Sequence, residues 1–249
     1  MFPSITFEED KILRLLDVLE SHDKFTPTHW GNSDLIKVAY SRSEIIKELK
    51  ESRISQMCLY RKQSIKYSAD LDIYFNLRSY LSFEFNNSMP SEYWEYFFNL
   101  TDQIATIAQP RYGVSHIIWP SSTPWKNERD RLHLWMDYAA SPLPIDFIPN
   151  GPLGLGLRTY FSGEVLEMFG RDLLLSTPAI VKELEWGGIR IDLVERPWEA
   201  DIDTILDQWL KSMKHLETAN VIAIPDFNEN GRSVNFSPNI EWEKWLKRD

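Results

Sequence analysis

The chain has 249 residues, of which 43% are hydrophobic and 13% aromatic, and this composition excludes an intrinsically disordered protein. Its 27 basic and 37 acidic residues give a formal net charge of −10. Such an excess repels the phosphate backbone, so nucleic acid is not an expected partner, whereas a basic protein is.

The cysteine content and the N-terminus indicate a soluble, cytoplasmic protein. A single cysteine, Cys58, cannot form an internal disulfide, which fits a reducing compartment. It lies between Met57 and Leu59, where we expect a buried position rather than a nucleophile. The first residues, MFPSITFEEDK, lack the basic and apolar regions of a secretory signal, and no apolar run approaches the roughly 18 residues of a membrane span.

The first 110 residues alternate between helical and strand patterns. A helix is predicted over 7–21, where Thr6 and Glu9 have the spacing of a capping box. A second helix, over 43–52, is expected to start at Ser41 or Ser43. Strand patterns follow between 54 and 85, and an aromatic-rich helix is predicted over 91–108.

The next stretch is interrupted by prolines. Residues 114–119 are predicted as a short buried strand, and a helix is predicted over 126–139. The proline-rich stretch 142–152 is the best candidate for a boundary or hinge, although its apolar residues predict that it packs. We therefore expect one α+β domain over 1–249, with 142–152 as the candidate division between an N-terminal half, 1–141, and a C-terminal half, 153–249.

The C-terminal half contains a hairpin signal. A strand over 155–161 and a helix near Gly163 are followed by strands over 180–186 and 189–195, which meet at Gly187–Gly188. Two glycines allow a two-residue turn with positive φ. The predicted cross-strand partners are Trp186 with Ile189, Leu184 with Ile191, and Glu185 with Arg190.

A helix from Asp201 to Leu216 and a strand over 221–224 complete the pattern. The fold class is therefore α+β, with mixed or antiparallel sheets and flanking helices.

One pair of carboxylates is a candidate for catalysis. Asp70 and Asp72 are two residues apart on a predicted strand and can share a metal ion, as in nucleotidyltransferases. Those enzymes also need a glycine-serine element upstream, and the preceding YRKQSIKYSA contains no glycine. We favour carboxylates on a water-facing edge strand, and keep the metal-dependent enzyme as the alternative function.

The remaining motifs do not predict catalysis. Gly154 and Gly156 imitate part of a dinucleotide fingerprint but lack its third glycine. Glu48 and Lys50 have the spacing of a nuclease motif but lie on a predicted helix, and the five histidines have no compact ligand spacing. We expect a protein without enzymatic activity, catalytic residues, cofactor or metal.

An acidic segment around Trp198 is the candidate partner-binding site. Aromatic residues flanked by carboxylates suit an interface with a basic partner. The same carboxylates also suit capping of the helix that begins at Asp201. The candidate residues are Glu195, Trp198, Glu199, Asp201, Asp203 and Asp207.

The region 155–198 also resembles a known family. Its motifs LGLRTYF, FGRDLL, the Thr177–Pro178 pair and LEWGGIRIDLVERPW resemble the immunity protein 52 family of bacterial polymorphic-toxin and type VI secretion systems. The resemblance covers roughly the last 100 residues. It implies an antitoxin that binds a cognate secreted toxin, often a restriction-endonuclease-like nuclease, and it carries over no catalytic residue.

Overall fold

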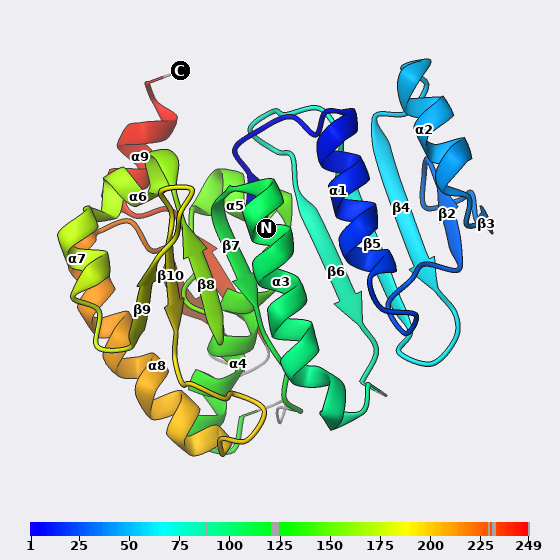
Figure 1. The fold of residues 1–249 in the computed structure, drawn as a ribbon. Coiled ribbons are helices and arrows are strands. Elements are labelled where there is room, and N and C mark those ends of the chain that lie inside the picture. Colours follow the sequence, from blue (N-terminus) through cyan, green and yellow to red (C-terminus); the bar gives the residue numbers. More distant parts are fainter. Residues whose placement is uncertain (88, 121–124, 229, 231–232, 249) are drawn as a thin grey trace. The chain divides into compact units, whose positions relative to one another are not determined.

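The computed structural model describes residues 1–87, 89–120, 125–228, 230 and 233–248, and it divides into two compact units, 1–110 and 111–249. The fold class is confirmed, since helices flank antiparallel sheets (Figure 1). The division falls at Pro110, not within 142–152. That proline-rich stretch instead forms a helix with a fully buried Phe147, so it packs as the sequence predicts. The single domain stays a prediction.

Unit 1 contains a five-stranded antiparallel sheet with the order β3-β2-β4-β5-β6. Its elements are β1 (Phe2–Pro3), α1 (Glu9–Glu20), β2 (His29–Gly31), β3 (Val38–Ala39), α2 (Arg42–Lys50), β4 (Gln56–Arg61), β5 (Tyr67–Asp72), β6 (Leu81–Phe85), the short 3-10 helix η1 (Ser91–Tyr93) and α3 (Trp94–Ala108).

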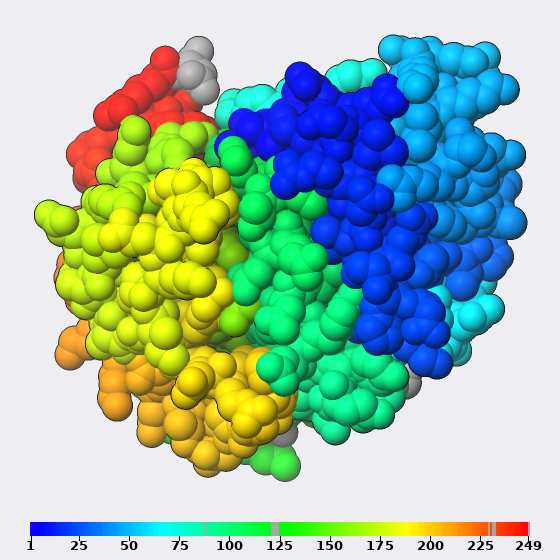
Figure 2. Space-filling model, viewed as in Figure 1, coloured from blue at the N-terminus to red at the C-terminus, as the bar shows by residue number. Residues whose placement is uncertain are grey.

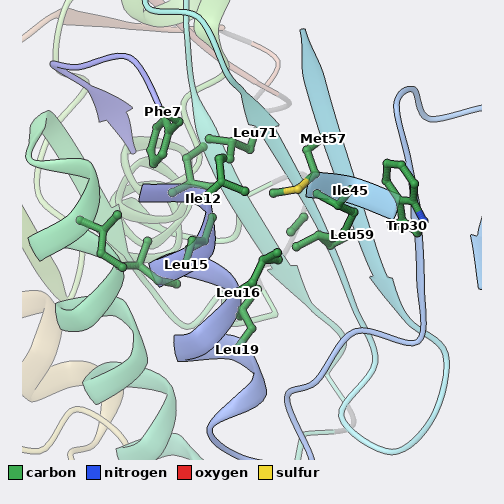
Figure 3. Packing of buried hydrophobic residues seen from close by; sticks show 14 of the residues in the cluster. Phe7, Ile12, Leu15, Leu16, Leu19, Trp30, Ile45, Met57, Leu59 and Leu71 are labelled. Atoms are coloured by element: carbon green, nitrogen blue, oxygen red, sulfur yellow. The ribbon is translucent and has the colours of Figure 1, made fainter. Parts of the chain in front are cut away.

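The core of unit 1 lies between its helices and one face of this sheet. Leu16 of α1 packs towards Leu59 and Leu71 of β4 and β5 (Figure 3). Because side chains alternate along a strand, residues of the same parity form this face. All three α-helices contribute to the cluster, through Ile12, Leu15, Leu16 and Leu19 of α1, Ile45 of α2, and Leu100, Ile104, Ile107 and Ala108 of α3.

Two helix starts in unit 1 test the capping predictions. Ser41 caps α2 by accepting a hydrogen bond from Glu44 N, as expected. The capping box at the start of α1 was wrong: Glu8 occupies the N-cap without a side-chain bond. The Thr6 hydroxyl instead accepts a hydrogen bond from Phe75 N at 3.2 Å, so a partner distant in the sequence replaces the local one.

Unit 2 contains strands in the order β7-β8-β10-β9, all antiparallel, and a separate β11-β12 hairpin. Its elements are β7 (Pro110–Ser115), α4 (Glu128–Ala140), α5 (Pro144–Asn150), β8 (Arg158–Phe161), α6 (Gly163–Phe169), α7 (Arg171–Leu175), β9 (Ile180–Glu183), β10 (Ile189–Asp192), α8 (Ile202–Leu216), η2 (Glu217–Ala219), β11 (Ile224–Phe227), β12 (Val234–Ser237) and α9 (Ile240–Leu246).

Two strands in unit 2 lie elsewhere than predicted. The strand expected over 114–119 begins earlier, as β7, and the strand expected over 221–224 begins only at Ile224. Val221, Ile222 and Ala223 are buried without being in a strand. The apolar run at 221–223 therefore reflects the burial of these residues and not a strand.

The predicted hairpin is present, but its register was wrong. Ile189 pairs with Glu183 and Ile191 pairs with Val181, so the strands are shorter than expected. Leu184 N donates to Gly188 O, and Gly187 N donates to Leu184 O. Only Gly187 has a positive φ, of 90°. The loop is therefore longer than two residues and uses one left-handed position, as three-residue hairpin loops do.

Candidate partner-binding surface

Asp201 caps helix α8. Its carboxylate accepts hydrogen bonds from Thr204 N at 2.9 Å and from the Thr204 hydroxyl at 2.7 Å. These hydrogen bonds hold the pKa of Asp201 below its usual range. Since the side chain is exposed, this carboxylate both starts the helix and adds charge to the surface.

Arg129 of α4 holds two of the predicted carboxylates. Its Nε lies 2.7 Å from Asp203 Oδ1, and its Nη1 lies 3.2 Å from Asp207 Oδ1. Asp203 and Asp207 are four residues apart and therefore lie on the same side of α8. All three side chains remain exposed, so this bridge contributes little to stability, on the order of 1 kcal/mol or less.

The loop before α8 holds the other three predicted residues. Glu199 Oε2 pairs with Arg196 Nη1 at 3.0 Å, and the Arg196 guanidinium lies 5.8 Å from the centre of the Trp198 ring. Trp198 is half-buried. Glu195 is exposed, and no ion pair to it occurs within the described ranges. Trp198 is therefore partly exposed beside the Arg196–Glu199 ion pair.

The structure thus brings two groups together from the predicted set. Arg129 joins Asp203 to Asp207, and Arg196 joins Glu199 to Trp198. Arg196 is local and visible in the sequence, but Arg129 is more than 70 residues away from its partners and no spacing rule points to it. The segment 195–207 carries five acidic residues and one arginine, and Arg129 adds a second guanidinium group, so negative charge predominates in this set.

The catalytic candidates Asp70 and Asp72 lie in unit 1, on β5. The prediction of an edge strand was wrong, because β5 pairs with β4 on one side and with β6 on the other. The Asp72 carboxylate accepts a hydrogen bond from Tyr80 N at 3.1 Å. Burial, followed by the nearby Asp70 charge, raises the pKa of Asp72. Within the described part of the chain, no three acidic, histidine or cysteine side chains group to hold a metal.

Gly156, from the partial dinucleotide motif, has a packing role. A Cβ at this position would lie 2.2 Å from Val114 Cγ1 of β7. The glycine therefore permits a close approach inside unit 2, and the motif does not join a strand to a helix as the dinucleotide fold requires.

Two of the five histidines lie in buried or half-buried settings. His116 Nε2 lies 3.0 Å from Asp137 Oδ1, with both side chains buried. Burial, followed by the Arg129 charge, lowers the pKa of His133.

Comparison with known proteins adds no relative: no family model, no curated protein and no solved structure matches this chain. The resemblance to the immunity proteins rests on the quoted motifs alone. No described helix is long and apolar enough to cross a bilayer.

Proposed function

We propose that this chain is a cytoplasmic immunity protein that binds a cognate secreted toxin and blocks it in the producing cell. The observation that carries the proposal is the acidic surface at the start of α8. Its five carboxylates are exposed, the same segment holds a half-buried tryptophan, and the carboxylates outnumber the two guanidinium groups that pair with them. A surface of this composition suits a basic partner.

The toxin is proposed to be a nuclease-like protein. A nuclease must carry a basic face to bind its nucleic-acid substrate, and that face complements the charge of this chain. Neutralisation then requires only tight binding. The proposal assigns the chain no enzymatic activity and no cofactor, and the metal-dependent alternative at Asp70 and Asp72 is not retained as a second candidate.

The test is co-expression with the product of the adjacent gene. We expect that product to arrest growth of a host cell when expressed alone, and this chain to restore growth and co-purify with it as a stoichiometric complex. A non-toxic neighbour, or toxicity that persists without a complex, would contradict the proposal. A Trp198→Ala, Asp203→Lys variant alters the proposed interface. It should fold but protect the cell less than the wild type does.

A further inference from the structure

Within the described residues, the α-helices of unit 1 pack on one face of its sheet, and the opposite face carries none of them. The residue row Leu59–Ala69–Phe83 across β4, β5 and β6 belongs to the helical core or packs against it. The next row, Cys58–Asp70–Ser82, therefore points to the opposite face. In Figure 1 and Figure 2, α1 and α2 lie on the side towards the viewer, so the helix-free face is turned away.

The helix-free face is acidic. Its strand residues on β5 and β6 include Asp70, Asp72 and Glu84, and none of the strand residues on this face is a lysine or arginine. Within the described residues, no basic side chain forms an ion pair with Asp70 or Asp72. Asp70 and Asp72 are half-buried and Glu84 is exposed. The β5 and β6 part of this face is thus accessible and negatively charged, whereas Cys58 and Tyr60 of β4 on the same face are buried.

A cation already lies on this face. The Lys37 ammonium, from the loop before β3, sits 4.2 Å from the centre of the Tyr60 ring. Tyr60 has the same strand parity as Cys58 and flanks the acidic row. In this contact the ring of Tyr60 binds a positively charged side chain.

Exposed apolar groups border the acidic residues. The loop that follows β5 carries Tyr74, which is 49% exposed, and Leu77, which is 39% exposed. It begins directly after Asp72 and returns through Tyr80, whose amide binds the Asp72 carboxylate. In protein interfaces, aromatic and apolar side chains form the buried core and polar groups form the rim, so these exposed side chains can serve as contacts beside the carboxylates.

We propose that this helix-free face, formed by Asp70, Asp72, Glu84 and the Tyr74–Leu77 loop, is a docking surface for an extended basic segment of a partner protein. Alternate residues of an extended segment project to one side about 6.5–7 Å apart, which matches the spacing of Asp70 and Asp72. Arginines at those positions can pair with both carboxylates. The inference rests on the proposed function for the identity of the natural partner, but the surface itself can be tested without the toxin.

The probe is the peptide Ac-Arg-Ser-Arg-Ser-Arg-amide, titrated into the full ¹⁵N-labelled chain and followed by NMR. We expect saturable shifts at the β5 and β6 amides and at Tyr80. The Asp70→Asn, Asp72→Asn variant should raise the Kd by about tenfold or more, since it removes both charges. The control variant, Asp23→Asn with Glu167→Gln, loses the same charge elsewhere and should stay within about twofold of the wild type.

A second measurement does not depend on how the variant folds. The peptide with citrulline in place of arginine keeps the shape but loses the charge, so it should fail to shift the same amides of the wild-type chain. The proposal is overturned if the arginine peptide shifts only residues of 195–207, if its shifts spread without saturation, or if the double variant binds as tightly as the wild type.

The two proposals fail separately. Growth protection without peptide binding at β5 and β6 would remove the docking surface and leave the immunity function. Peptide binding at this face without protection would remove the immunity function alone.

Discussion

Cys58 lies on β4 with its thiol buried, and its surroundings change its chemistry. Burial, followed by a hydrogen bond with Asp70, raises the pKa of this thiol to about 12. At pH 8 very little of this thiol is then ionised, whereas a free cysteine is substantially ionised. The single cysteine is therefore a core residue, as its position between Met57 and Leu59 predicts.

This setting predicts that Cys58 resists alkylation while the protein is folded. Iodoacetamide at pH 8 should leave the native chain unmodified over hours and modify it within minutes in guanidinium, as measured by intact mass. Asp70→Asn removes the secondary cause of the raised pKa and leaves burial in place, so its native labelling should stay slow. Labelling of the native wild type at the rate of a free thiol would show that the site is open.

The site carboxylates show which residue-scale features a sequence predicts. The cap formed by Asp201 depends on a donor three residues away, so its spacing identified it. The bridge from Arg129 depends on the packing of α4 against α8, and nothing in the local pattern could reveal it. The same difference separates Ser41, whose predicted cap exists, from Thr6, whose hydroxyl is taken by a distant amide.

At the scale of secondary-structure elements, the sequence predicted which helices and strands exist better than it predicted how the strands pair. The hairpin, the helix from Asp201 and the strands between Ile54 and Phe85 all follow from local periodicity and turn residues. The pairing register of the hairpin could not be predicted in this way, because two adjacent glycines also permit a longer loop with a single left-handed residue. The place of β5 inside its sheet depends on pairing with β6, which no pattern within β5 specifies.

The observed loop predicts different roles for the two glycines of the hairpin. Gly187 has φ of 90° with open space around it, so Gly187→Ala should cost about 1 kcal/mol through backbone strain. Gly187→Asn should cost less, because asparagine tolerates this conformation. Chemical denaturation of the wild type, Gly187→Ala and Gly187→Asn measures their order of stability. Equal stability of all three would contradict the assigned loop.

Gly188 provides the control for that experiment. A Cβ there would lie 2.3 Å from the Trp186 ring, although its φ is ordinary. Gly188→Ala should therefore be destabilising in the wild type and nearly neutral in a Trp186→Ala background. A double-mutant cycle thus separates steric contact at Gly188 from backbone strain at Gly187.

At the scale of the whole molecule, the net charge of −10 acts on encounter more than on the bound complex. Long-range attraction raises the association rate of a basic partner and weakens as salt shortens the screening length to about 8 Å at physiological strength. Local contacts, such as those of the Trp198 ring, affect dissociation instead. Association and dissociation rates therefore distinguish a surface that only attracts the partner from one that contacts it in the complex.

The difference between association and dissociation rates can test whether the acidic segment 195–207 is the interface. Glu199→Lys with Asp207→Lys should slow association with the toxin by about tenfold at low salt, and the difference should shrink as salt rises. Asp23→Lys with Glu167→Lys changes the net charge equally at other exposed positions, so it should slow association less. Both variants should keep their melting temperatures within a few degrees, because the substituted side chains are exposed. Stopped-flow kinetics at several salt concentrations measures the rates. If the two variants slow association equally, only the total charge matters and the segment 195–207 is not the interface; the helix-free face with Asp70 and Asp72 then becomes the surface to mutate next.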